Sequence, residues 1–438
     1  MALLPITGKI NRQIHTIGFT IAGFTATLLV GGFLVQSADA YRDRTSTTGV
    51  VYTESNTPTE NGENENTVLG FQRDADGNLT PLPTSPFSTG GAGIRNAGGI
   101  TVQNVIANSE HTRLFAINSG SNTIAVFDIN QQDGSLSPVE GSPFPSGGVN
   151  PVSLGLAKDI LYVVNRNKDP KNPSQDASGS LPNYTAFRVT PKGRLIPVSG
   201  STVSDPTDSR PTQALISQDK HLLFGVDRGS GLLRSFQILR GGRLLESPNS
   251  PQPLPASEFS PGTPQATVLG SGTPQATALG LQEHPKLPIL YVGFFTINKL
   301  GVYSFDPRTG KLLFLKTVPN SGQLVCWLTT NRAGTRLYTS NPGDNSISVY
   351  DIATDPTTPV EIQNVKLHGS GGSADLTLDP TESFLQAVSQ GNSPNIAEGN
   401  GLDVLKVNPQ DGTLSEVSSS PFPLPSVNGS VPLGIVAK

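Results

Sequence analysis

Short runs in which apolar and polar residues alternate recur along the chain from about residue 49 to its end. Thr123–Ile129 and Ser346–Ile352 are clear examples. Strict alternation is typical of a β-strand that buries one face. Between such runs stand glycine turns, most visibly the Asp-Gly pairs at positions 76–77, 133–134 and 411–412, and such a pair is a strong hairpin signal. The pattern therefore predicts a chain of short antiparallel strands.

These turns belong to a longer phrase that repeats along the chain. After the turn, the phrase continues into Ser-Pro-Phe at three places, Ser85–Phe87, Ser142–Phe144 and Ser420–Phe422. Looser copies of the turn occupy positions 192–195, 241–244 and 309–312. A period near fifty residues indicates a repeat architecture. Each repeat adds two β-rich runs upstream of its hairpin, so it supplies four antiparallel strands, which is one blade of a β-propeller.

The number of repeats follows from the spacing of the turn glycines. Gly310 and Gly412 are separated by two periods, and the strand-like runs Leu337–Asn341 and Ser346–Ile352 supply the repeat between them, which makes seven repeats in all. The interval from Gly242 to Gly310 is longer than the others because it contains a tandem copy, 262–270 against 272–280. We interpret this duplication as a loop insertion between two blades, where added length is tolerated.

The two ends of the repeat region complement each other. The first repeat has strand-like runs at Gly49–Thr53 and Thr67–Phe71 without an inner strand before them, whereas Val431–Ala437 reads as an inner strand with nothing after it. We therefore predict an all-β, seven-bladed propeller over 49–438, made of four-stranded antiparallel blades. The C-terminal strand joins the first blade and closes the ring, which removes an open sheet edge.

Composition narrows the function classes. The 47 glycines and 37 prolines suit many turns, and a net charge of −4 without basic clusters argues against nucleic-acid binding. The chain lacks the Gly-x-Ser-x-Gly elbow, the His-Glu-x-x-His zinc motif, a Cys-x-x-Cys pair and a phosphate-binding glycine loop. The single cysteine, Cys326, cannot form an internal disulfide. No stretch has the spacing of an EF-hand, so we expect neither a metal nor another cofactor.

The N-terminal region predicts export. Basic residues precede the apolar run 17–35, and Ala38–Ala40 fits a small-residue cleavage site. We interpret 1–40 as a signal peptide and 41–48 as a short linker, with an uncleaved membrane anchor as the alternative because the apolar run is just long enough to span a bilayer. We expect a monomer in the periplasm or outside the cell, in contact with a membrane only if the N-terminal segment is retained.

Several local sequences resemble those of lactonase-type seven-bladed propellers. They are Leu161–Asn165, Cys326–Leu328, Asn331–Gly334, Asn341–Gly343, Ser346–Ile352 and Ser373–Leu376. The resemblance runs roughly from Gly49 to Lys438. The proteins that the chain resembles are 6-phosphogluconolactonase-like proteins and secreted bacterial proteins with Tyr-Val-Thr-Asn repeats, and the resemblance implies lactone hydrolysis. In the 6-phosphogluconolactonase-like proteins, a histidine often opens an inner strand, and arginine, histidine and glutamate in the channel are the proposed catalytic groups.

This chain departs from that pattern in its inner strands. The residues that open them are Ser153, Gln213, Trp327 and Asp375 rather than histidine. A phosphosugar requires several Arg or Lys side chains, and the sequence shows no such cluster. For Trp327, the alternatives are stacking on a ligand and packing between blades.

Loop lengths indicate where recognition would occur. In a propeller, the loops between second and third strands share one face, the loop face, with the connections between blades, and the Asp-Gly turns lie on the opposite turn face. The long insertions 56–66, 167–183, 248–272 and 391–400 all fall on the loop face. We expect binding at the channel mouth on that face, because long loops on a rigid scaffold usually carry recognition; neutral variation of exposed loops is the alternative.

A polar residue ends the second strand of most repeats. These residues are Glu54, Asn118, Asn165, Asp227 and Asn341. One interpretation is that they bond the local backbone and start the following turn. The other is that they form a polar ring around the channel mouth and bind a ligand together with Ser153, Gln213 and Trp327.

Two functions follow from these observations. The first is an exported lactonase that hydrolyses a lactone or sugar-acid ester, with His368 and Asp375 as candidate general bases and polar donors that hold the developing oxyanion. The second is a non-catalytic envelope scaffold that binds a small carbohydrate-derived ligand or a protein partner on the loop face.

Overall fold

The computed structural model describes residues 49–59, 66–94, 105–167, 180–259, 277–391, 399–425 and 431–438. Thr45–Lys438 forms one compact unit. The predicted signal peptide, most of the tandem copy and the central parts of the four long insertions lie outside the described residues. No helix within the described ranges is long and apolar enough to cross a membrane.

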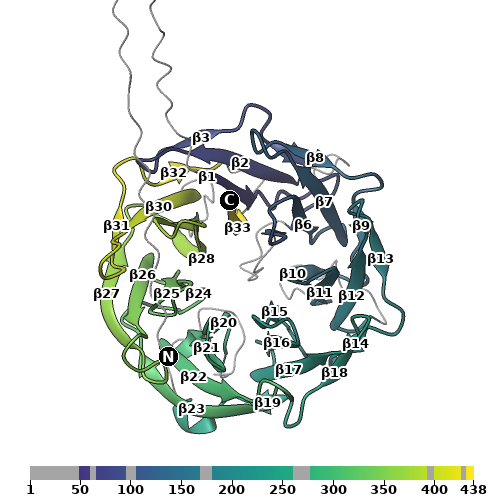
Figure 1. Cartoon of the computed structure of the whole chain (residues 1–438), viewed down its shortest axis with the longest axis vertical. Helices are drawn as coiled ribbons and strands as arrows, with labels where there is room; N and C mark the ends of the chain where they lie inside the picture. The colour runs from purple at the N-terminus through teal and green to yellow at the C-terminus, as the bar shows by residue number, and fades with distance from the viewer. Residues whose placement is uncertain are drawn as a thin grey trace, which may run out of the picture. The chain divides into compact units, whose positions relative to one another are not determined.

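The described strands form seven antiparallel blades arranged in a ring, which confirms the predicted fold class (Figure 1). Blade 1 contains β1 (Gly49–Glu54), β2 (Thr67–Arg73), β3 (Leu79–Pro81), β4 (Phe87–Ser88) and β33 (Leu433–Ala437). Blade 2 contains β5 (Val105–Ala107), β6 (Arg113–Asn118), β7 (Thr123–Ile129), β8 (Leu136–Pro138) and β9 (Phe144–Pro145). Blade 3 contains β10 (Pro151–Ala157), β11 (Ile160–Asn165), β12 (Asn183–Val189), β13 (Leu195–Pro197) and β14 (Val203–Ser204).

The remaining blades follow the same order from the inner strand outward. Blade 4 contains β15 (Leu215–Ile216), β16 (Leu222–Asp227), β17 (Leu232–Ile238), β18 (Leu244–Glu246) and β19 (Gln252–Pro253). Blade 5 contains β20 (Leu281–Glu283), β21 (Ile289–Phe294), β22 (Lys299–Phe305) and β23 (Leu312–Pro319). Blade 6 contains β24 (Leu328–Thr330), β25 (Arg336–Asn341), β26 (Ser346–Asp351) and β27 (Val360–Lys366). Blade 7 contains β28 (Gly372–Leu378), β29 (Phe384–Gln390), β30 (Gly401–Val407), β31 (Leu414–Glu416) and β32 (Phe422–Pro423). Two short 3-10 helices, η2 (Ala256–Glu258) and η4 (Phe295–Ile297), are also described.

The ring closes as predicted, through the C-terminal strand. β33 pairs antiparallel with β1, and Lys438 exchanges both backbone hydrogen bonds with Val50, at N–O distances of 2.9 and 2.7 Å. Blades 1 and 7 are also joined by a buried ion pair, in which Arg73 Nη2 lies 2.9 Å from Asp379 Oδ2. The Arg73 guanidinium stacks over the Phe384 ring, 4.0 Å from its centroid. First and last blades are therefore held together by backbone pairing, charge and aromatic contact.

The two halves of the repeated phrase have separate structural roles. The turn glycines adopt positive φ and lie against the preceding blade, where Tyr52 Oη donates to the Gly134 carbonyl at 2.6 Å and Tyr338 Oη to the Gly412 carbonyl at 3.0 Å. The serine of Ser-Pro-Phe lies where the outer strand is interrupted, and the Ser85 hydroxyl accepts the Gly70 amide of the third strand at 2.9 Å. The repeated phrase therefore has a structural role. Its turn joins neighbouring blades, and its serine hydroxyl accepts a hydrogen bond from a third-strand amide that the interrupted outer strand does not pair.

Candidate functional site

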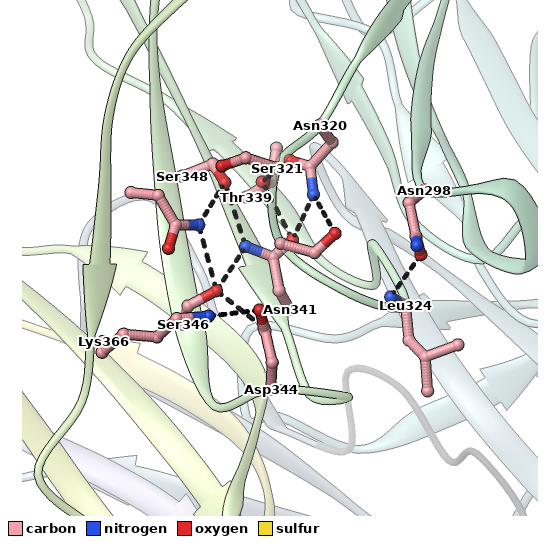
Figure 2. Close-up of polar contacts among 12 residues, drawn as sticks. Asn298, Asn320, Ser321, Leu324, Thr339, Asn341, Asp344, Ser346, Ser348 and Lys366 are labelled. Atoms are coloured by element: carbon pink, nitrogen blue, oxygen red, sulfur yellow. Dashed lines mark hydrogen bonds and ion pairs between the residues drawn. The ribbon is translucent and has the colours of Figure 1, made fainter.

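The residues that end the second strands are buried and bonded within the scaffold. Asn341 illustrates the arrangement (Figure 2): its Oδ1 accepts from Asn320 Nδ2 at 3.0 Å, and its Nδ2 donates to the hydroxyls of Ser346 and Ser348, each at 3.1 Å. Its exposed fraction is 0 %. Gly322 lies so close above it that a Cβ on this glycine would come within 2.2 Å of Asn341 Nδ2. Asn341 therefore ties its strand to the incoming interblade connection.

The equivalent residues behave in the same way. Asn118 accepts from Thr89 Oγ1 at 2.6 Å, Asn165 donates to Asn183 Oδ1 at 3.0 Å, and Asp227 accepts the Arg210 amide at 2.7 Å. Glu54 accepts a hydrogen bond from Asn66. All four are 0 % exposed, so their side chains offer no surface to a ligand in this structure. The local hydrogen bonds fit the first interpretation of these positions; a ligand-binding ring stays a prediction that their burial does not favour.

The inner-strand residues divide into two groups. Ser153 and Gln213 are buried and join their blades to the next one. The Ser153 hydroxyl accepts the Ala214 amide at 3.1 Å, and the Gln213 side chain bonds both the amide and the carbonyl of Leu281, at 2.7 and 3.2 Å. Trp327 and Asp375 stand at the corresponding place in blades 6 and 7, but both line a cavity.

This channel cavity has a volume of about 480 Å³ and lies among the inner strands β5, β24, β28 and β33. It also reaches the turns that join first and second strands, because its lining includes His111, Gln218, Pro285, Arg332 and Glu382. Those turns share the turn face with the Asp-Gly hairpins, so the cavity opens there. The predicted site on the loop face depends on insertions whose central parts lie outside the described residues.

Two buried carboxyls, Asp375 and Asp379, line this cavity, and Asp375 is the one without a paired cation in the described residues. Its exposed fraction is 3 %, and burial raises its pKa to about 8, although the Leu376 amide donates to its Oδ1 at 2.7 Å and favours the charged form. The side chain is therefore protonated at neutral pH and suited to donate a proton. Burial, reinforced by Asp375, also raises the pKa of the neighbouring Cys326 thiol to about 12, so this thiol is unreactive.

The structure does not bring His368 to Asp375. His368 is exposed, and its ring Nδ1 lies 3.3 Å from Glu416 Oε2 on β31, the short strand at the outer edge of blade 7. Asp375 lies on β28 at the opposite edge of that sheet, and three strand spacings of about 4.8 Å separate those edges. As a catalytic pair, these two residues are therefore not supported by the geometry.

His111 lines the cavity, although the sequence pattern favours His368 as the catalytic histidine. It lies in the short turn between β5 and β6, and burial, with the positive charge of Lys438, lowers its pKa. Its imidazole is consequently neutral at neutral pH and can accept a proton. No local motif marks His111 or Glu382, because each occupies an ordinary short turn; only the convergence of first turns around the axis brings them together.

Comparison with known proteins agrees with this fold. Residues 257–375 and 328–428 match the model of the family described as "Lactonase, 7-bladed beta-propeller", and these ranges include Trp327 and Asp375. No curated protein matches the chain significantly. The predicted resemblance to lactonase-type propellers is confirmed by the family match and by the fold.

Solved structures with the same fold cover nearly the whole propeller. A putative 6-phosphogluconolactonase from Bacteroides uniformis superposes with a TM-score of 0.64 at 13 % identity, covering 89 % of this chain and 99 % of its own. The periplasmic gluconolactonase of Pseudomonas aeruginosa superposes with a TM-score of 0.61 at 16 % identity, covering 88 % and 99 %. A Lactobacillus plantarum protein superposes with a TM-score of 0.63 at 16 % identity, covering 89 % of this chain and 99 % of its own. At these identities, the likeness establishes the fold.

Proposed function

We propose that this lactonase-type propeller hydrolyses an uncharged sugar lactone in the channel cavity, with Asp375 as the acid. The observation that carries the proposal is a protonated carboxyl set in the wall of a polar-lined cavity on the propeller axis. The family-model match supports it, because the matched ranges supply blades 6 and 7, which contribute Trp327 and Asp375 to the wall.

The chemistry requires proton transfer at both ends of the reaction. Water adds to the lactone carbonyl carbon, the ring C–O bond breaks, and the departing alkoxide oxygen takes the proton of Asp375. A buried neutral carboxylic acid also stabilises the developing negative charge by donating a hydrogen bond. The proton released by the attacking water passes to solvent, and Asp375 is reprotonated from solvent.

The charge of the lining favours a substrate without phosphate. Among the described residues that line the channel cavity, Arg332 is the single Arg or Lys, and its Nη2 already donates to the Pro380 carbonyl at 3.0 Å. Asp379 is neutralised by Arg73, and Glu382 adds a negative charge. Because phosphate recognition relies on clustered basic side chains, a simple aldonolactone suits this lining better than a 6-phosphogluconolactone.

The proposal also includes export of the protein after cleavage of its N-terminal segment. The basic and apolar segments of 1–40 favour a cleaved signal, and the similar Pseudomonas protein is described as periplasmic. Mass spectrometry of the exported protein tests this directly: a chain that begins at Tyr41 supports cleavage, whereas an intact N-terminus in the membrane fraction contradicts it.

A panel of lactones tests the reaction. Purified protein is assayed against glucono-1,5-lactone, galactono-1,4-lactone and 6-phosphogluconolactone, with spontaneous hydrolysis subtracted. We expect hydrolysis of the uncharged lactones and a much lower kcat/KM for the phosphorylated one. Rates equal to buffer on every lactone contradict catalysis, and saturable binding without turnover would favour the non-catalytic alternative.

A further inference from the structure

A second cavity, of about 250 Å³, lies between blades 6 and 7 beside the channel cavity. Both cavities are lined by Asn331, Leu378 and Glu382, so these residues form a sill between them. The Arg332 amide donates to Glu382 Oε1 across the sill, which joins the first turn of blade 6 to that of blade 7. We call this second space the interblade cavity.

The interblade cavity is lined largely by polar groups. Arg336 is engaged by an ion pair with Asp351, at 2.7 Å, and by the Asp411 carbonyl. Thr335, Thr381 and Gln410 add hydroxyl and amide groups to the lining. Glu382 and Asp411 add carboxylates to this lining, and amide, hydroxyl and carboxylate side chains can exchange hydrogen bonds with the hydroxyls of an uncharged ligand.

The position of the sill sets the length of a ligand that uses both cavities. Asp375 and Leu378 are three residues apart on β28, or roughly 10 Å at about 3.3 Å per residue. A single sugar ring whose carbonyl reaches Asp375 ends before the interblade cavity, whereas a second ring linked to it passes over the sill.

We propose that the interblade cavity is a glycosyl subsite and that the substrate class is a disaccharide aldonolactone. The lactone ring lies against Asp375, and the glycosyl ring lies between blades 6 and 7. This inference rests on the proposed lactonase function and names the substrate class of that same site.

Gln410 provides a matched test of the subsite. It lines the interblade cavity at an exposed position of the Gln-Asp-Gly turn of blade 7, and its backbone N–H donates to Asn408 Oδ1 at 3.0 Å. Gln132 occupies the same place in the turn of blade 2, where its backbone N–H donates to Asn130 Oδ1 at 2.9 Å. Gln410→Trp fills the cavity, and Gln132→Trp adds the same bulk elsewhere.

The assay compares cellobiono-1,5-lactone with glucono-1,5-lactone. We expect Gln410→Trp to lower kcat/KM for the disaccharide lactone by at least about tenfold, as one or two lost hydrogen bonds would, and to leave glucono-1,5-lactone unchanged. Gln132→Trp should match wild type on both, and equal melting temperatures exclude misfolding. Equal effects of Gln410→Trp on both lactones, or none on either, overturn the subsite while the lactonase function stands.

If neither lactone is hydrolysed, the proposed function fails and binding decides the subsite. Calorimetric titration with cellobionate supports the subsite when wild type and Gln132→Trp bind it and Gln410→Trp does not. Wild-type protein that does not bind cellobionate overturns it.

Discussion

Blades 3 and 4 differ from blades 6 and 7 at one equivalent position of the inner strand. In blades 3 and 4, Ser153 and Gln213 bond the backbone of the next blade. In blades 6 and 7, Trp327 and Asp375 line the channel cavity, and Asp375 keeps a carboxyl whose pKa burial raises to about 8. A repeated position can therefore serve either assembly or chemistry, and the hydrogen-bond partner of the side chain decides which.

The largest expected effect comes from Asp375→Asn, which keeps the shape but removes the transferable proton. We expect kcat/KM on glucono-1,5-lactone to fall by about 10²–10⁴-fold, the range for loss of general acid catalysis. Asp403→Asn is the matched control, because Asp403 is a buried blade 7 carboxyl whose pKa burial raises to about 7 but which does not line the cavity. Similar losses in both variants would contradict a specific role for Asp375.

Removal of the Arg73 side chain tests how much the ion pair between blades 1 and 7 stabilises the closed ring. Arg73→Met leaves the Asp379 carboxylate buried without its cation, so we expect the free energy of unfolding to fall by about 3–5 kcal/mol. Chemical denaturation measures this loss. A change below about 1 kcal/mol, the value of an exposed pair, would show that the closure does not depend on this ion pair.

Gln213→Ala tests the assembly side of the comparison. It leaves the buried Leu281 amide and carbonyl without their side-chain partner, so we expect a loss of about 1–3 kcal/mol in the free energy of unfolding and an unchanged kcat. The exposed Gln132→Ala should change stability by less than about 0.5 kcal/mol. A kcat that falls in Gln213→Ala while stability holds would place Gln213 in the site instead.

The buried acid also predicts a pH dependence of stability. The folded protein holds the Asp375 proton up to a pKa of about 8, whereas the unfolded chain releases it near about 3.9. The native state thus binds more protons between these values, and this residue makes the free energy of unfolding fall as pH rises through that window. Denaturation at pH 6 and 8 should show a fall about 2 kcal/mol larger in wild type than in Asp375→Asn. Identical slopes would contradict the buried acid.

The fold was predictable because its signals are local. Alternation, glycine turns and an unpaired last strand specify blades, their number and the closure through β33 without reference to distant contacts. The positions of Ser153, Gln213, Trp327 and Asp375 at the inner strands were predictable for the same reason.

The roles of those positions were not predictable, because they depend on which side chain reaches the next blade. The lengths of the loops predict a binding site on the loop face, whereas the channel cavity opens among short turns on the turn face. Its shape arises from packing around the axis, which brings His111 of blade 2 and Glu382 of blade 7 to one lining although 271 positions separate them. The sequence places His368 near a connection between blades, and its contact with Glu416 has no counterpart in the sequence pattern.

The pH dependence of hydrolysis tests the central claim, that protonated Asp375 is the acid, most directly. The kcat/KM for glucono-1,5-lactone is measured from pH 5.5 to 8.5 in wild type and Asp375→Asn, with spontaneous hydrolysis subtracted. The account predicts that the wild-type value declines as pH approaches and passes about 8, and that Asp375→Asn is slower and lacks this decline. A wild-type rate that rises through pH 8, or an alkaline decline that persists in Asp375→Asn, would contradict it.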